Sequence, residues 1–334
     1  MPYNIKNIIS RKPRSGLIFP YLDIRPPSPL FLVIHITLSC NRKCSWCYQI
    51  QDNFYRSFNA HMPINAFKKI LASFRHFKPH IHIYGGEPLF HPEFPLFLKY
   101  SQMYGYRPTL TTNGDYLSKH SKAIIQSYLS QLNISLNGMV GCDGNFDLNL
   151  QKIIKDFIMA NKGKKIINLN YVIEPGSYKY LKELVSFLNS NYKEKEFYCL
   201  AFQHLSSGLI TDSQSGGIDL AELANLITRI KKMKLKFKLL FLPDIKISDF
   251  KNYYNTKYAF KNKCYVPWLG LNIYPDLTVT PAGGIFTCNY SLGNLEQMSV
   301  IDIWNGAKLK NFCSSLIKGG LPQTCNRCCH KLYY

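Results

Sequence analysis

The sequence predicts an α/β protein, a partial (βα)6 TIM-like barrel with a small cysteine-rich domain after it. The first observation is a sixfold alternation of apolar, β-rich runs with segments of helical periodicity between residues 31 and 210. Because the strand runs are apolar on both faces, we expect a parallel sheet covered by helices. The second observation is that six of the eleven cysteines follow residue 263. This cysteine density indicates a separate cysteine-rich unit.

Residues 1–30 are expected to form an extended lead-in to the first strand, because prolines interrupt helices. The segment has basic residues but no apolar core followed by a cleavage site, so no secretory signal is predicted. It is also too short for an independent peptide-binding domain. The prolines that interrupt it include Pro13, Pro20, Pro26, Pro27 and Pro29.

The barrel is expected to consist of six strand–helix units. In the segment 63–76, for example, Ile64, Phe67 and Ile70 recur at helical spacing. Six units rather than eight imply an open barrel, and in such folds the loops after the carboxyl ends of the strands carry the chemistry. The predicted strands are 31–37, 80–84, 108–112, 132–137, 166–173 and 196–202, and the predicted helices are 63–76, 93–104, 119–130, 147–161, 178–191 and 219–234.

A polar, glycine-containing break at residues 210–218 separates the predicted core, 31–210, from the C-terminal part of the chain. Residues 211–263 are expected to be a helical and basic connector, and 264–334 a second unit with its own cysteines. From Arg229 to Lys263 the chain carries eleven lysines and arginines against two aspartates. The connector is therefore strongly basic.

The net charge of +21 favours acidic partners, such as an acidic peptide segment, a phosphorylated substrate or nucleic acid. A lysine-rich surface that contacts only water is the alternative. No RNA-reading module accompanies the charge, so nucleic acid is the lesser hypothesis. No run of about 18 apolar residues is present, which argues against a membrane span, and a cytoplasmic location is predicted.

Three cysteines, Cys40, Cys44 and Cys47, come after the first predicted strand in a C-x3-C-x2-C arrangement. Three thiolates would hold three irons of a 4Fe–4S cubane and leave the fourth open for a small molecule. Two alternatives remain: buried cysteines on one helical face, and a structural zinc site completed by a fourth ligand. Cys142 and Cys199 stand apart and are expected to be small apolar residues.

Three further motifs come after predicted strands: Y-G-G-E-P at 84–88, T-T-N-G at 111–114 and I-S-L-N-G at 134–138. Together with the cysteines they make residues 30–210 resemble the radical S-adenosylmethionine (SAM) superfamily. The resemblance implies that the cluster of Cys40, Cys44 and Cys47 binds SAM. One-electron cleavage of SAM then yields a 5′-deoxyadenosyl radical that abstracts hydrogen from a substrate C–H bond.

The resemblance also implies a set of SAM-binding residues. Glycines at 85 and 86 allow close backbone approach because they lack a Cβ, and Glu87 would fix their loop. Asn137 replaces an aspartate common in the family, which leaves no acid–base group there. The implied SAM-binding residues are Trp46, Tyr48, Gly85, Gly86, Glu87, Thr112, Asn113, Ser135 and Asn137, with Asn170 and Val172 as further contacts and Tyr84, His35, Gln203 and His204 as pocket candidates.

The C-terminal unit contains G-x4-C, C-x2-C and an L-G-N…I-W segment, and resembles SPASM and twitch extensions that carry auxiliary Fe–S clusters. We expect one auxiliary 4Fe–4S cluster. Ala282 stands where the family usually has cysteine, so Cys313 or Cys329 could replace a ligand. A four-cysteine zinc site is the alternative. The expected ligands are Cys264, Cys288, Cys325 and Cys328.

The predicted function is that of a radical SAM oxidoreductase that oxidises or cross-links a ribosomal peptide or protein side chain. A dehydrogenase acting on a sugar or other small molecule is the alternative, and a non-catalytic zinc protein that binds nucleic acid is a distant third. An electron donor such as flavodoxin or ferredoxin is an expected partner.

Overall fold

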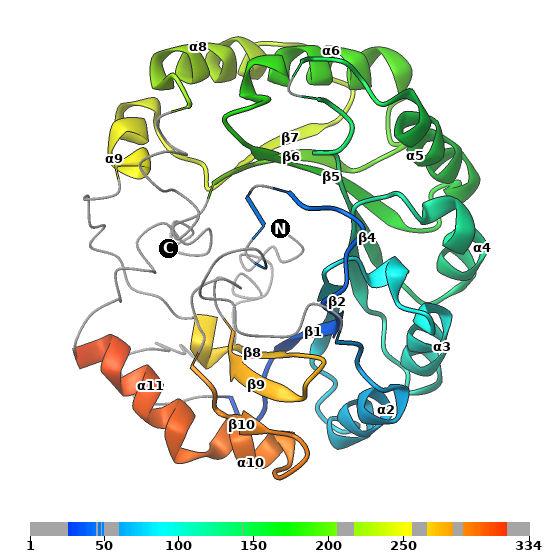
Figure 1. Ribbon diagram of the computed structural model, residues 1–334, viewed down its shortest axis with the longest axis vertical. Helices are drawn as coiled ribbons and strands as arrows, with labels where there is room; N and C mark the ends of the chain where they lie inside the picture. The colour runs from blue at the N-terminus through cyan, green and yellow to red at the C-terminus, as the bar shows by residue number, and fades with distance from the viewer. Residues whose placement is uncertain are drawn as a thin grey trace, which may run out of the picture.

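The computed structural model describes residues 26–44, 46–47, 49, 60–141, 143–205, 217–255, 266–282 and 290–318. Within these residues the strands form one sheet of ten, in the order β10-β9-β8-β1-β2-β3-β4-β5-β6-β7. Figure 1 shows the sheet curving inside an outer arc of helices. No helix of the described ranges has the length and apolar character to cross a membrane.

Strands β1 to β7 are parallel, each paired with the next, and helices connect them. The α/β partial-barrel class is therefore confirmed. The strands are β1 (Phe31–Thr37), β2 (His80–Gly85), β3 (Thr109–Thr112), β4 (Gln131–Ser135), β5 (Ile166–Ile173), β6 (Cys199–His204) and β7 (Lys238–Leu242). The helices beside them are α2 (Ile64–Ser73), α3 (Phe94–Met103), α4 (Leu117–Gln126), α5 (Leu148–Asn161), α6 (Leu181–Asn191) and α8 (Leu220–Lys231).

The main core lies between the sheet and the helices. Alternate residues of each strand enter it, such as Leu32 and Ile34 of β1, because successive side chains of a strand point to opposite faces. Phe67 and Ile70 of α2 are buried against them, on the face that the helical periodicity predicted. The apolar pattern thus fixes which face of each strand is turned towards the helices.

The opposite face of the same strands carries a connected polar layer. The ring of His82 is bonded to Thr109 Oγ1 at 2.6 Å and to Thr111 Oγ1 at 3.2 Å. Asn168 Nδ2 donates to Asn133 Oδ1 at 3.0 Å one strand further on. Burial lowers the pKa of His82 well below its ordinary value, so the ring is neutral. The barrel interior is therefore lined by uncharged hydrogen-bonding groups.

The sheet continues beyond β1 into the C-terminal part of the chain. Strand β8 (Gly270–Ile273) is parallel to β1, while β9 (Thr278–Pro281) and β10 (Gly293–Asn294) add antiparallel strands. Trp304 Nε1 donates to Pro26 O at 2.9 Å. The other elements are α9 (Phe250–Tyr254), α10 (Val300–Asn305), α11 (Ala307–Lys318) and the short 3-10 helices η3 (Pro88–Phe90), η4 (Tyr178–Tyr180), η5 (Ile247–Asp249) and η6 (Val266–Trp268).

Candidate functional site

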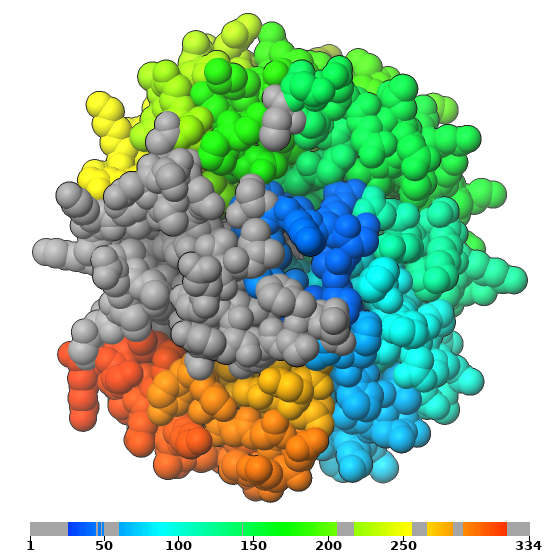
Figure 2. Space-filling view, in the orientation of Figure 1, coloured from blue at the N-terminus to red at the C-terminus, as the bar shows by residue number. Residues whose placement is uncertain are grey.

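The loop that leaves the carboxyl end of β1 presents three thiol groups. Cys40 is exposed, and Cys44 and Cys47 are half-buried. Cys47 N donates to Cys44 O at 2.9 Å, which folds the second half of the loop into a turn. Burial raises the pKa of Cys40 and of Cys44, whereas a bound metal would favour their thiolates. Figure 2 shows atoms from the first described segments, in blue, at the centre of this face of the molecule.

Three thiols on one loop are a donor set that fits an iron–sulfur cluster. A cubane takes each thiolate on a different iron, so the sulfurs do not have to converge on one point as they do for a single ion. Within the described ranges, no three histidine, cysteine, aspartate or glutamate side chains converge in that way. The chemistry of the loop is therefore that of a cluster site open on one side.

The glycines after β2 lie directly against this loop. Gly86 N donates to Thr37 O at 2.9 Å. A Cβ on Gly85 would lie 2.1 Å from Thr37 O, and one on Gly86 would lie 2.3 Å from Ser39 O. Such distances are impossible without backbone movement. The glycines were expected to permit close approach to SAM, and the approach that the structure requires of them is to the backbone ahead of Cys40.

Glu87 is buried and connects the loop after β2 to the loop after β3. Its carboxylate accepts hydrogen bonds from Leu89 N at 3.0 Å, Thr112 Oγ1 at 2.7 Å and Asn113 N at 2.6 Å. Burial raises the pKa of Glu87 to about 7, and the three hydrogen bonds oppose that shift. The carboxylate holds the T-T-N-G turn as well as its own loop, which the sequence had suggested only for the latter.

The side chains of Thr112 and Asn113 form hydrogen bonds inside the protein. Gly114 N donates to Thr112 Oγ1 at 3.1 Å, and Asn113 Nδ2 donates to Asn41 Oδ1 at 2.9 Å. Asp115 N donates to Asn113 Oδ1 at 3.1 Å. Both residues lie at the carboxyl edge near the cysteine loop, as predicted. Their contact with SAM stays a prediction, in competition with these partners.

Arg42 and Asp115 form an ion pair that sequence reasoning missed. Arg42 Nε donates to Asp115 Oδ2 at 2.7 Å, and its Nη2 donates to Oδ1 of the same carboxylate. Asn41 Nδ2 donates to Asp115 Oδ2 at 2.6 Å. A Cβ on Gly138 would overlap the Arg42 guanidinium. The pair thus ties the segment between two cysteines to the loops after β3 and β4. The only sequence signal was the position of both partners beside motifs.

Asn137 joins the carboxyl ends of β4 and β5. Its Nδ2 donates to Val172 O at 2.8 Å and its Oδ1 accepts from Val172 N at 2.8 Å. The same Nδ2 lies 3.1 Å from Glu174 Oε1. Because both ends of the amide are engaged, the structure gives Asn137 a bridging role between strands. Ser135 and Asn170, at the same edge, are half-buried.

The remaining predicted residues divide between the core and the open edge. His204 is buried and bonded to Tyr254 OH at 2.7 Å, and burial lowers its pKa to about 3. His35 stacks on Tyr274 with ring centroids 4.4 Å apart. Half-buried side chains are Trp46, Tyr84, Val172 and Gln203. Six of the predicted site residues lie outside the described part of the chain: Tyr48, Cys264, Cys288, Cys325, Cys328 and Cys329.

Comparison with known families gives two matches along the chain. Residues 34–140 match the model of the radical SAM superfamily. Residues 264–329 match that of SPASM, an iron–sulfur cluster-binding domain. The first match contains all four motifs of the barrel, and the second contains the four predicted auxiliary ligands. No curated protein matches the sequence.

Solved structures with a similar fold include Streptococcus suis SuiB bound to S-adenosylmethionine, which is 20% identical. The alignment covers 90% of this chain and 72% of SuiB, with a TM-score of 0.64. SuiB bound to the precursor peptide SuiA gives 19% identity with the same coverages and TM-score. The enzyme anSMEcpe with bound AdoMet gives 14% identity, coverages of 90% and 86%, and a TM-score of 0.62.

A radical SAM domain implies a 4Fe–4S cluster and SAM, and a SPASM domain implies auxiliary iron–sulfur binding. Both implications agree with the three-thiol loop at the carboxyl edge and with the cysteines beyond residue 263. The neighbouring structures agree with the observed curved parallel sheet. The chain belongs to the radical SAM superfamily and carries a SPASM iron–sulfur domain after its radical SAM domain.

Proposed function

We propose that this protein is a radical SAM oxidoreductase that oxidises or cross-links a side chain of a ribosomal peptide or protein. The observation that carries the proposal is the assembly of three motifs into one edge. The cysteine loop contacts the G-G-E-P loop through Thr37 and Ser39, and the T-T-N-G turn through Asn41 and Arg42. Such an edge holds a redox cofactor and a second ligand side by side.

In this proposal Cys40, Cys44 and Cys47 ligate the cluster, and SAM occupies the open iron. The bound pair supplies one-electron cleavage of SAM and the group that abstracts hydrogen. The residues of the chain bind and orient: Trp46 lies beside the adenine, and Gly86 and Ser135 face the amino-acid and ribose parts. Because their loops are fixed to one another by hydrogen bonds, little ordering remains when the ligands bind.

A peptide substrate is supported by the fold shared with SuiB bound to its precursor peptide over 90% of this chain. The half-buried groups of the inner face, Tyr84, Asn170 and Gln203, are suited to hydrogen bonds with peptide amides. We assign 31–210 to the catalytic core and 264–334 to the auxiliary domain, with one 4Fe–4S cluster. An acidic flavodoxin or ferredoxin would supply the electron in the cytoplasm.

A sugar or another polar small molecule is the second candidate substrate. The neutral layer of His82, Thr111, Asn133 and Asn168 favours it, since hydroxyl-rich molecules match uncharged donors and acceptors. Substrates deuterated at carbon distinguish the two classes, because the abstracted deuterium appears in 5′-deoxyadenosine. Label from a peptide supports the first candidate, and label from a sugar supports the second.

The test of the proposal is anaerobic reconstitution with iron and sulfide, followed by assay of SAM cleavage after reduction. Two clusters predict about eight irons per chain. The triple variant C40A/C44A/C47A should lose about four irons and all 5′-deoxyadenosine formation. The matched control Cys199→Ala removes a buried thiol of β6 and should retain both. A triple variant with unchanged iron and SAM cleavage would overturn the proposal.

A further inference from the structure

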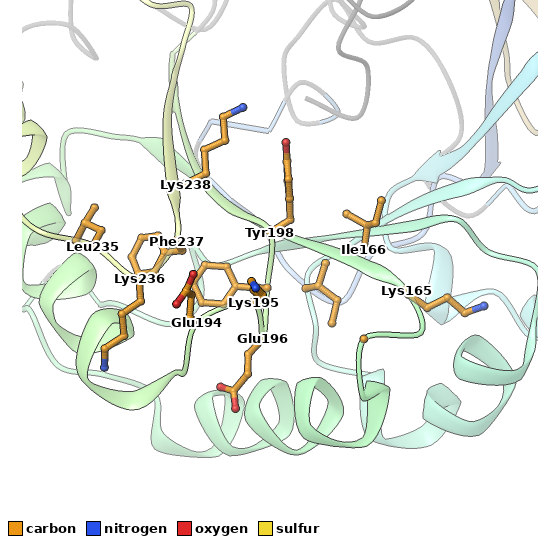
Figure 3. Close-up of a pocket in the computed structure, with 13 residues that line it drawn as sticks. Lys165, Ile166, Glu194, Lys195, Glu196, Tyr198, Leu235, Lys236, Phe237 and Lys238 are labelled. Atoms are coloured by element: carbon orange, nitrogen blue, oxygen red, sulfur yellow. The ribbon is translucent and has the colours of Figure 1, made fainter.

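A groove opens at the end of the sheet opposite the cysteine loop. It has a volume of about 370 Å3 and is lined by three short segments, 163–167, 194–198 and 235–238. These segments lie at the amino ends of β5, β6 and β7. Figure 3 shows the lining side chains around these strand ends. The volume is within the range of about 300–1,000 Å3 that is typical of ligand pockets.

The groove carries an excess of positive charge. Four lysines line it, Lys165, Lys195, Lys236 and Lys238, against two glutamates. None of the four forms an ion pair with a residue in the described ranges. Glu196 accepts a hydrogen bond from Lys193 N at 2.8 Å, so one of the carboxylates serves its own turn. The positive charge is therefore not neutralised within the part of the chain that the structure describes.

Further basic residues crowd the rim near Lys165. Burial lowers the pKa of Lys165, and the neighbouring charges of Arg107 and Lys164 lower it further. Like charges at short range repel one another, and a bound anion would relieve that repulsion. The lysine amino group donates a hydrogen bond to Ser127 O, which keeps it at the rim.

Large apolar side chains are exposed beside these lysines. Tyr198 is 56% exposed and Ile166 is 51% exposed. Lys238 Nζ lies over the Tyr198 ring, 5.6 Å from its centroid. In Figure 3, Tyr198, Lys238 and Ile166 extend to the same side of the strand ends. A ligand that covers them would carry apolar groups next to anionic ones.

The composition of the groove favours a peptide over nucleic acid. Its cations are all lysines, whereas recognition of phosphates and bases relies strongly on arginine. Glu194 and Glu196 would repel the continuous charge of a phosphate backbone. A single exposed aromatic ring, Tyr198, also offers little base stacking among the lining residues. A peptide can instead alternate carboxylates with apolar side chains.

We propose that this groove binds an acidic peptide segment, with carboxylates on Lys236 and Lys238 and an apolar side chain against Tyr198 and Ile166. The groove is a docking site at the amino end of the barrel, away from the edge that holds the cysteines. Docking of such a segment does not depend on the reaction. That the segment belongs to the substrate rests on the proposed function.

The test is fluorescence anisotropy with the full reconstituted protein and a labelled peptide that alternates glutamate with leucine and tyrosine. Binding should weaken as salt rises. The variant K236E/K238E should bind the peptide about tenfold more weakly. The matched control K119E/K122E changes the same charge on exposed positions of α4 and should bind like the parent protein.

A second variant tests the apolar contact. Tyr198→Ala should weaken binding of the leucine and tyrosine peptide severalfold but leave binding of an all-glutamate peptide unchanged. Absence of binding, or equal losses in the groove and control variants, would overturn the proposal. Tighter binding of a single-stranded RNA of equal charge would overturn it in favour of nucleic acid.

The docking site and the reaction fail separately. K236E/K238E should keep the iron content and the SAM cleavage of the parent protein, because the changed residues lie at the far end of the strands. If the parent protein binds the peptide but does not cleave SAM, docking holds and the proposed function fails. If it cleaves SAM but does not bind the peptide, the reverse is true.

Discussion

The two ends of the sheet use their charged side chains differently. At the carboxyl end, Arg42 is paired with Asp115, and Glu87 accepts three hydrogen bonds from neighbouring loops. At the amino end, Lys236 and Lys238 form no ion pair within the described ranges, and apolar side chains beside them are exposed. Paired charges hold loops in one arrangement, whereas unpaired charges remain available to a partner. The contrast separates an edge built for positioning from an edge suited to docking.

The largest expected effect comes from placing the same methyl group at each end. Gly86→Ala should lower the free energy of unfolding by about 4 kcal/mol, because its Cβ would meet backbone atoms of Leu38 and Ser39. Gly163→Ala, on the groove, meets no atom within 4 Å and should cost about 1 kcal/mol for its positive φ. Anaerobic urea denaturation measures both. Equal losses would show that the carboxyl edge is not the more tightly packed end.

The second effect is a pH dependence from Glu87. Its folded pKa of about 7 lies above the ordinary value of 4.5, so the folded state binds the proton more tightly. The resulting stability is present below pH 4.5 and is lost as the pH rises through 7, a change of about 3 kcal/mol. Glu87→Gln should remove this slope in urea denaturation series. Glu196→Gln, at the amino edge, is the control and should leave the slope intact.

The third effect compares two ion pairs. A double-mutant cycle on Arg42→Gln and Asp115→Asn should give a coupling energy of about 2 kcal/mol, because the pair is bidentate and mostly shielded from water. The Lys231–Asp244 pair is far more exposed and should give about 0.5 kcal/mol or less. Similar values for the two pairs would remove the argument that the first one fixes the cysteine loop.

The smallest effect is expected at the groove. Lys236→Gln should change the free energy of unfolding by no more than about 0.5 kcal/mol, and towards greater stability, because it removes a like charge from a positive cluster. Thermal unfolding beside the control Lys119→Gln measures the difference. A loss above about 1 kcal/mol would mean that Lys236 has a structural partner.

The barrel was predictable because its signals are local. Apolar strand runs, helical periodicity and the motifs after strands 31–37, 80–84 and 108–112 are each contained in a few residues. Strand β7 (Lys238–Leu242) was missed as a strand, because alternating lysines made residues 235–242 look like part of the basic connector. The predicted strand 196–202 lies at 199–204 instead, since Lys195 adopts a positive φ in the preceding turn.

The contacts that assemble the site could not be predicted, because they join distant segments. Arg42 and Asp115 are 73 positions apart, and neither residue type is unusual in a loop. The glycines at 85 and 86 were recognisable as sites of close approach, but the sequence does not name the approaching atoms. Thr37 and Ser39 emerged as those partners only from the folded chain.

The pairing of β8 with β1 has a consequence for how the protein is made. The strand that leads into the cysteine loop has β2 on one side and β8 on the other, and Phe31 is in register with Gly270. During synthesis one edge of β1 therefore lacks this partner until most of the chain has left the ribosome, and contacts of such long sequence separation form slowly. We expect a late-closing nascent chain, with an interval in which cluster-assembly proteins can reach the three thiols before the sheet is complete.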